Sequence, residues 1–154
     1  MEKSYEETQR IDTIWPLSIM ALVSVINYVI YFHLDHLDIS FFYGSMISTA
    51  FVSGLLFFMR LHTKINEKTI NYKLFPLHLK WQTILWSDVE KSEIRTFKPI
   101  REYGGWGIRN SFSSGKAYII NGNTGLQLYM KTGKKILIGT KQEDKLQTFI
   151  KTPK

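Results

Sequence analysis

The residues whose types and spacing most resemble a binding motif lie in KPIREYGGWGIRNSF, residues 98–112, where three glycines and a tryptophan stand between arginines. Glycine permits positive φ or close approach of the backbone to a ligand, and such backbone is frequent at phosphate sites. A dinucleotide or Walker-type loop needs a GxGxxG frame or a Lys-Ser/Thr pair at the start of a helix, and this segment has neither. The sequence therefore offers no known nucleotide motif here.

Two interpretations of this segment remain open. In the first, the glycines form a bend or bulge between two strands, as isolated glycines in strands often do. In the second, the segment is a binding loop in which Arg101 and Arg109 bind a carboxylate or phosphate. Trp106 is then either a core side chain or an exposed anchor. The bend is the favoured interpretation, because glycine in a strand usually marks tight backbone geometry.

Metal and thiol chemistry have little support in the sequence. Cysteine is absent, which excludes a thiolate nucleophile, a disulfide framework and a thiolate metal site. His33, Asp35, His36 and Asp38 lie in HLDHLD, and imidazole and carboxylate are ordinary zinc ligands. Four polar residues in a short link fix no coordination geometry, so we expect a solvated turn.

Catalytic chemistry is no better supported in the second half of the chain. A nucleophilic triad needs a nucleophile, a base and an orienting group in one pocket, and the histidines here are His62 and His78, both beside apolar residues. Asp88, Glu90 and Glu93 are grouped, but no carboxylate pair stands out for general acid–base work. We therefore predict a protein that is not an enzyme and has no catalytic residue, cofactor or metal.

Two long apolar stretches precede this region. Residues 13–32 and residues 39–59 contain no charged side chain. At about 1.5 Å per residue, a helix of such length spans roughly 30 Å, the thickness of a bilayer's hydrocarbon core. A signal peptide is an alternative for the first stretch, but the preceding tail is acidic and a second stretch follows at once. The sequence predicts a tail over residues 1–12 and a two-helix transmembrane hairpin over residues 13–59.

The distribution of Lys and Arg predicts the topology. The link of residues 33–38 has neither residue, whereas Lys3 and Arg10 precede the first stretch and Arg60 follows the second. The positive-inside rule places both termini and the C-terminal domain in the cytoplasm, with the chain integral to the inner (plasma) membrane. Small residues at helical spacing would allow close helix packing and a homo-oligomer: Gly44, Ser48, Ala50 and Gly54.

Residues 60–154 have a different composition. They hold 18 of the 20 Lys and Arg residues and seven of the 13 Asp and Glu residues, a net charge of +11. Alternating runs separated by Gly and Asn turns predict an antiparallel meander of strands. The runs are LHTKIN, TINYKLF, SEIRTFKPI, KAYIIN, GLQLYMK and KKILIGT.

The last residues predict one amphipathic helix. Thr140 and Glu143 have capping-box spacing, and Leu146, Phe149 and Ile150 share one face. A small sheet cannot bury both faces alone, so a terminal helix would close the open end of a bent sheet or partly closed barrel. The predicted fold class is an α+β membrane protein, with a helical hairpin followed by a barrel of about seven antiparallel strands and a capping helix.

Three segments carry a resemblance to a known family: ILWSDVEKSEIRTFKPI, YGGWGIR and AYIINGNTGLQLYMKTGKKILIGTKQEDKLQTFI. As an ordered set they resemble bacterial membrane-anchored pleckstrin-homology-like proteins, in which two spans precede a compact domain. The resemblance implies a PH-like split β-barrel of seven strands closed by a C-terminal helix, and no established enzymatic activity. Eukaryotic relatives that bind phosphoinositides carry a lysine and an arginine pair on the first strands, and this chain has Lys64, Lys68 and Lys73 there instead.

These features together predict a membrane-anchored interaction or scaffolding module. Its basic domain would meet anionic lipid headgroups or an acidic protein partner, since +11 beside a negative leaflet favours contact. A membrane-tethered nucleic-acid-binding protein, or an accessory subunit of an enzyme or transporter, is the alternative. The candidate anion- or partner-binding residues are Arg101, Trp106, Arg109, Lys131, Lys134 and Lys135.

Overall fold

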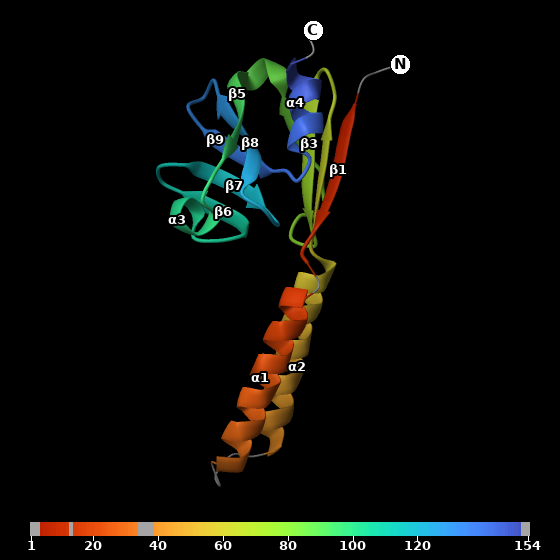
Figure 1. Ribbon diagram of the computed structural model, residues 1–154, viewed down its shortest axis with the longest axis vertical. Helices are drawn as coiled ribbons and strands as arrows, with labels where there is room; N and C mark the ends of the chain where they lie inside the picture. Colours follow the sequence, from red (N-terminus) through yellow and green to blue (C-terminus); the bar gives the residue numbers. More distant parts are fainter. Residues whose placement is uncertain (1–3, 13, 34–38, 152–154) are drawn as a thin grey trace. The chain divides into compact units, whose positions relative to one another are not determined.

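The computed structural model describes residues 4–12, 14–33 and 39–151, which form two compact units (Figure 1). Residues 11–59 make the helical unit, and residues 1–10 together with 60–154 make the β unit. Asp35, His36 and Asp38 of the predicted polar link lie outside the described residues. Each unit is described by itself below.

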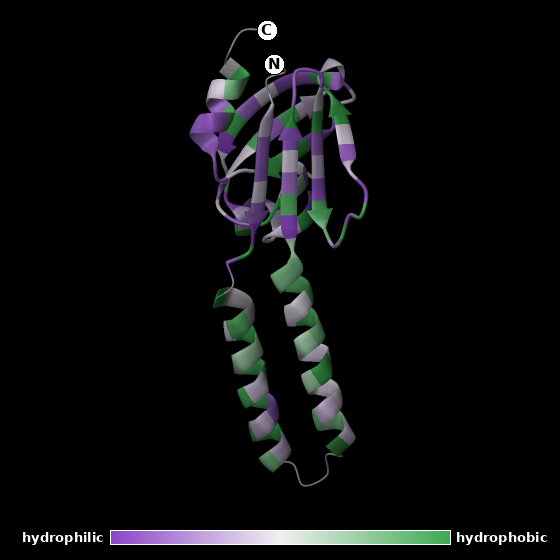
Figure 2. Ribbon diagram, turned by 90° about the vertical axis from the view of Figure 1, so that its right-hand side faces the viewer, coloured by the Kyte–Doolittle hydropathy of each residue, from purple (hydrophilic) through white to green (hydrophobic). Residues whose placement is uncertain are grey.

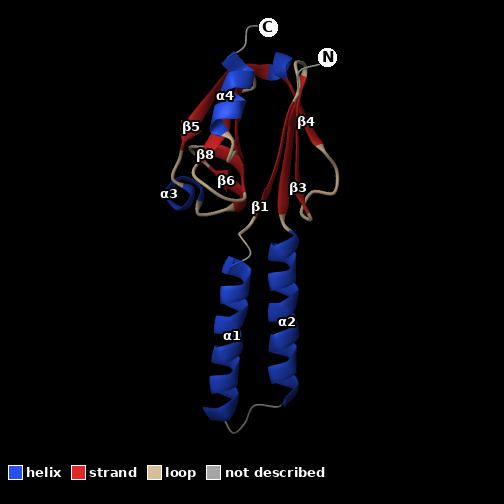
Figure 3. Ribbon diagram, turned by 45° about the vertical axis from the view of Figure 1, so that its right-hand side comes forward, coloured by secondary structure: helices blue, strands red, loops and turns tan. Residues whose placement is uncertain are grey.

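The helical unit consists of α1 (Ile14–His33) and α2 (Ile39–Phe58), which lie side by side (Figure 3). Their large apolar side chains face outward, as Leu22 at 62% exposure and Phe51 at 67% show. Within the described residues, α2 is the one helix long and apolar enough to cross a membrane, and the apolar stretch of α1, Leu17–His33, is shorter. The predicted pair of spans is thus seen as one candidate span beside a second apolar helix.

Polar side chains within the two helices bond to the helix that carries them. The hydroxyls of Ser18 and Ser24 donate to carbonyls four residues earlier, both at 2.8 Å. The Asn27 amide donates to the Val23 carbonyl at 2.8 Å. These serine and asparagine side chains therefore donate to the backbone of their own helix.

Sheet A of the β unit holds four antiparallel strands in the order β1 (Tyr5–Arg10), β2 (Arg60–Ile65), β3 (Thr69–Phe75) and β4 (Gln82–Leu85). Apolar and polar residues alternate along β2 and β3, so one face of the sheet is buried and the other solvated (Figure 2). The sequence predicts a tail over residues 1–12, but residues 5–10 form β1. Its inward side chains include Glu7 and Gln9, whose polarity hides the strand from a search for apolar alternation.

Sheet B holds five strands in the order β5, β8, β9, β7, β6. Their bounds are β5 Val89–Thr96, β6 Gly107–Ser111, β7 Gly115–Ile119, β8 Thr124–Met130 and β9 Lys135–Gly139. A short 3-10 helix, η1 (Trp86–Asp88), precedes β5. β7 and β9 are parallel, with Lys116 opposite Ile136, so the predicted antiparallel meander is wrong at this pair.

The strand count and closure also differ from the prediction. The described residues form nine strands in two separate sheets and no closed barrel, where the sequence predicts a barrel of about seven strands. The two sheets face each other (Figure 3), with the rings of Tyr72 in β3 and Tyr118 in β7 in contact at 4.5 Å between centroids. The coarser prediction, an α+β fold rich in antiparallel strands, is confirmed.

The other face of sheet B is covered by α3 (Pro99–Tyr103) and the segment around it. This second core consists of Phe97, Tyr103, Ala117, Ile119 and Leu137, all buried. Phe97 and Tyr103 pack edge to face, with ring centroids 6.0 Å apart. The centre of sheet B is therefore buried on both faces, which explains the consecutive buried residues in β8 and β9.

The C-terminal helix α4 (Glu143–Lys151) confirms the predicted amphipathic helix, and its Leu146 is buried. It lies beside β1, where Glu7 links the two elements. The Glu7 carboxylate accepts hydrogen bonds from the Tyr5 hydroxyl, the Thr140 hydroxyl at 2.7 Å and the Lys141 N–H at 2.8 Å. The Thr140 hydroxyl in turn accepts the Gln142 N–H at 3.0 Å, so β1 supports the start of α4.

Candidate functional site

The GGWG segment is built around the end of α3. Gly104, Gly105 and Gly107 have φ of 72°, 123° and 101°, so of the two possibilities that glycine offers here, positive φ is the one present at all three. The N–H of Gly104 donates to the Ile100 carbonyl, and that of Gly105 donates to the Pro99 carbonyl. This is a glycine cap on a short helix, a position where glycine avoids a steric cost. The sequence predicts a bend between two strands, and the structure has a helix end before β6.

Arg95 fastens this helix to sheet B. Its guanidinium donates to the Glu102 carboxylate at 2.8 Å, to the Tyr103 hydroxyl at 3.1 Å and to the Gln127 side chain at 3.2 Å. Burial by itself would raise the pKa of Glu102, but the N–H of Lys98 and the Arg95 charge together lower it. Each carboxylate oxygen of Glu102 thus accepts a hydrogen bond from within the protein, one from Arg95 and one from the Lys98 N–H.

Three of the predicted site residues lie on this segment. Arg101 on α3 and Trp106 are exposed, and Trp106 at 46% exposure is not a core side chain. The Arg109 Nε donates to the Trp106 carbonyl at 2.8 Å, and its guanidinium lies against Gly105. Arg109 therefore binds the protein's own backbone, which leaves the segment with the geometry of a cap.

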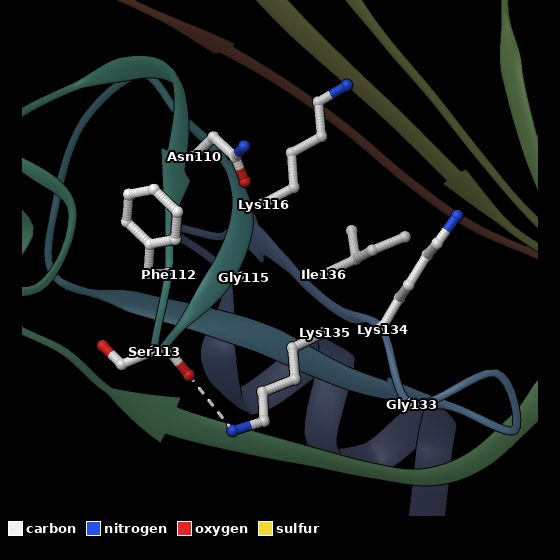
Figure 4. A pocket seen from close by; sticks show the side chains of 9 residues that line it. All are labelled: Asn110, Phe112, Ser113, Gly115, Lys116, Gly133, Lys134, Lys135 and Ile136. Atoms are coloured by element: carbon white, nitrogen blue, oxygen red, sulfur yellow. Dashed lines mark hydrogen bonds between the residues drawn. The ribbon is translucent and has the colours of Figure 1, made fainter.

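The other predicted residues, Lys131, Lys134 and Lys135, come from the turn between β8 and β9. Lys134 and Lys135 line a groove of about 560 Å³ (Figure 4). The remaining lining residues are Asn110, Phe112, Ser113, Gly115, Lys116, Gly133 and Ile136. Lys131 is exposed in the same turn without lining the groove. The structure thus brings two of the six predicted residues together with residues that sequence reasoning missed.

The parallel pairing of β7 and β9 creates this groove. The β6–β7 turn precedes β7 and the β8–β9 turn precedes β9, so parallel strands bring both turns to one end of sheet B. Gly115 permits the approach, because a Cβ there would lie 2.3 Å from the Lys135 carbonyl oxygen. The sequence signal that could have found it is SFSSGK, a polar hairpin turn with one aromatic residue, Phe112, followed by a lysine.

The groove is positively charged. Lys116, Lys134 and Lys135 line it and no carboxylate does. Lys116 and Lys134 extend in the same direction in Figure 4, and Lys135 donates to the Ser113 carbonyl at 3.2 Å. Lys116 also lies over the Tyr118 ring, 5.3 Å from its centroid. Phe112 is fully exposed at the rim. Three lysine side chains and an exposed aromatic ring therefore line the groove, and no carboxylate offsets their charge there.

The histidines and carboxylates lie elsewhere. Burial lowers the pKa of His62, with Lys73, Arg60 and Arg10 adding to the effect. Burial and then Lys116 lower the pKa of His78. The Glu93 carboxylate accepts hydrogen bonds from Lys91 and Tyr129, which lower its pKa. In the parts of the chain that the structure describes, no three metal-binding side chains of His, Asp or Glu converge.

Comparisons with known proteins add no assignment: the sequence matches no family model and no curated protein.

Proposed function

We propose that this chain is a membrane-anchored, non-enzymatic interaction module. α1 and α2 form the anchor, and the β unit is a pleckstrin-homology-like domain that presents its basic groove to an anionic group on a lipid or a protein. The groove carries the proposal, since it combines Lys116, Lys134, Lys135 and the exposed Phe112 at one end of sheet B. The ligand group is anionic because the groove wall supplies ammonium groups and no carboxylate.

The anchor is supported by the surface of the helical unit. Exposed large apolar residues cover both helices, and a soluble protein rarely exposes an apolar patch of more than a few hundred Å². The polar side chains bond within their own helices, which suits a solvent that offers no partner. Lys and Arg flank the helices and are absent from residues 33–38, so both termini would be cytoplasmic at the inner membrane.

Binding of soluble anions to the whole chain tests the groove. The chain would be placed in nanodiscs of zwitterionic lipid and titrated with tripolyphosphate, with a polyglutamate peptide and with a single-stranded oligonucleotide. Each lysine near an anionic group contributes about 1 kcal/mol of binding free energy. Loss of all three in K116Q/K134Q/K135Q should therefore weaken binding about 100-fold. The matched control K68Q/K98Q/K145Q removes the same charge from exposed positions outside the groove.

Equal losses in the two triple variants would mean diffuse electrostatic attraction and would refute the groove. Oligonucleotide binding that exceeds both other probes at equal charge would favour the nucleic-acid alternative. The anchor has its own test, because a tag on the N-terminus should be reached only after cells are permeabilised. A tag that is reached in intact cells would contradict the topology.

A further inference from the structure

The loop between β3 and β4 is a second exposed surface that the groove does not explain. It carries Leu77, Leu79 and Trp81 at 59%, 74% and 49% exposure, with the exposed Lys80 between two of them. Isolated exposed apolar residues are ordinary, but three large ones within five positions of one loop are an apolar patch. The loop therefore offers a surface suited to an apolar environment.

His78 holds this loop in place. Its N–H donates to the Leu74 carbonyl at 2.6 Å, and its ring packs on Tyr118 with centroids 5.5 Å apart. With His78 turned to the protein, its neighbours Leu77 and Leu79 are left exposed on either side. The apolar side chains are thus presented on a fixed backbone, which reduces the entropy lost when they are buried.

Basic residues flank the loop on the outer face of sheet A. Arg10, Arg60 and Phe75 are opposite one another in the register of β1, β2 and β3, with His62 and Lys73 paired two positions further on. The Trp81 ring lies 6.2 Å from the His62 ring, which joins the loop to this basic face. Leu and Trp beside Lys and Arg is the composition of segments that lie at the boundary of anionic bilayers.

The chain itself connects this end of sheet A to the helices. Residues 11–13 join Arg10 to α1, and Met59 alone joins α2 to Arg60. Consecutive Cα atoms are about 3.8 Å apart, so a bilayer crossed by α2 lies within a few residues' length of Arg60. Phe75, the last residue of β3 before the loop, is the register partner of Arg60.

We propose that Leu77, Leu79 and Trp81 insert into the boundary between headgroups and acyl chains of an anionic bilayer, with Arg60, Lys73 and Lys80 on its phosphates. This contact rests on the proposed function, because the bilayer is the one that α2 crosses. It would fix the orientation of the β unit against the membrane. Trp81 suits the position, since an indole ring prefers the level of the headgroups.

Spin labels on single cysteines test the contact, since the chain has no cysteine of its own. Leu79→Cys, Glu67→Cys and Ile47→Cys would be labelled in the full chain, in nanodiscs with about 30% phosphatidylglycerol. Glu67 is an exposed turn residue between β2 and β3, and Ile47 is exposed in the middle of α2. We expect oxygen to relax the labels at 79 and 47 more than a nickel chelate does, and the reverse at 67.

Each result has one meaning. A label at 79 that the nickel chelate reaches, with the label at 47 in lipid, overturns the loop contact and leaves the anchor standing. If the nickel chelate reaches both the label at 79 and the label at 47, the proposed membrane anchor itself is overturned. A label at 79 that neither reagent reaches indicates cover by protein, such as a second copy, and also overturns the contact.

Lipid composition tests the part assigned to the basic residues. In nanodiscs of phosphatidylcholine alone, the label at 79 should be shallower, and K73Q/K80Q should produce the same shift in anionic nanodiscs. The matched control K68Q/K145Q removes two exposed lysines away from the loop and should leave the depth unchanged. A depth that is the same in both lipids overturns the role of Arg60, Lys73 and Lys80.

Discussion

The segment after α3 and the turn between β8 and β9 both place glycine beside basic residues, as GGWGIR at 104–109 and KTGKK at 131–135. In the first, the glycines end a helix and the Arg109 side chain donates to the backbone carbonyl of Trp106. In the second, Lys134 and Lys135 line a groove with residues of another turn. The segment with three glycines is thus a helix cap, and the segment with one glycine lines the candidate site.

The difference separates what glycine indicates from what a ligand needs. A run of glycines reports local backbone constraint, which a helix end satisfies as well as a phosphate loop does. A binding site needs side chains from separate segments brought together, and here the parallel pairing of β7 and β9 does so. That pairing joins residues that are about 20 positions apart, so it leaves little trace in a local pattern.

The largest expected effect contrasts one glycine from each region. Gly115 and Gly104 both have positive φ, 78° and 72°, but a Cβ at Gly115 meets the Lys135 backbone while one at Gly104 meets nothing within 4 Å. Gly104→Ala should cost about 1 kcal/mol of unfolding free energy, and Gly115→Ala at least about 3 kcal/mol. Urea unfolding of the detergent-solubilised chain, followed by tryptophan fluorescence, measures both. Equal costs would mean that the β7–β9 approach is not tight.

A second contrast separates stability from binding. Arg95→Gln removes the charged partner of the half-buried Glu102 and of the buried Tyr103 hydroxyl, so we expect a loss of about 2 kcal/mol of unfolding free energy. Lys64→Gln breaks an exposed pair with Glu6 and should cost less than about 0.5 kcal/mol. Neither variant should change tripolyphosphate binding at the groove. Weaker binding by Arg95→Gln in a folded chain would mean that α3 belongs to the site.

How much the sequence predicts follows from how local each feature is. The terminal helix and the runs at β2, β3, β7, β8 and β9 rest on neighbouring residues, and all are confirmed. The run SEIRTFKPI is confirmed as a strand only as far as Thr96 in β5, because its last residues begin α3. β1, β4 and β6 were missed, because each is short or carries polar residues inward, as Glu7 and Gln9 do. The polar side chains of β1 find their hydrogen-bond partners only in the folded chain, where Gln9 donates to the Gly139 carbonyl of β9 and Glu7 accepts the Lys141 N–H before α4.

The candidate site was predicted in part for the same reason. Lys134 and Lys135 are conspicuous in the sequence, but Lys116 and Phe112 join them through strand pairing. Arg101, Trp106 and Arg109 were selected on glycine content, which here reports the cap of α3. The proposed membrane anchor rests on composition, and α2 alone has the length and hydropathy of a span among the described residues.

A change of pH should have a smaller effect on the unfolding free energy, through His62 and His78. His78 faces Lys116, and His62 faces Lys73, Arg60 and Arg10; burial and these charges lower the pKa of both side chains. The unfolded chain binds protons near pH 6.5 where the folded chain does not, so unfolding free energy falls as pH drops from about 7 to below 6. His62→Gln/His78→Gln should flatten this slope in urea titrations. If the double variant keeps the same dependence of unfolding free energy on pH, that dependence comes from other groups.

The smallest expected effect tests the cap directly. Arg101→Ala and Arg109→Ala remove exposed charges, so the unfolding free energy should change by less than about 1 kcal/mol. Arg109 has the larger share because its Nε bond to the Trp106 carbonyl is lost. At equal salt, each variant should weaken tripolyphosphate binding less than Lys134→Ala does, since screening affects all these charges alike. A greater loss at Arg109 than at Lys134 would show that its guanidinium leaves the backbone to meet the anion, and the segment would then be a binding loop as well as a cap.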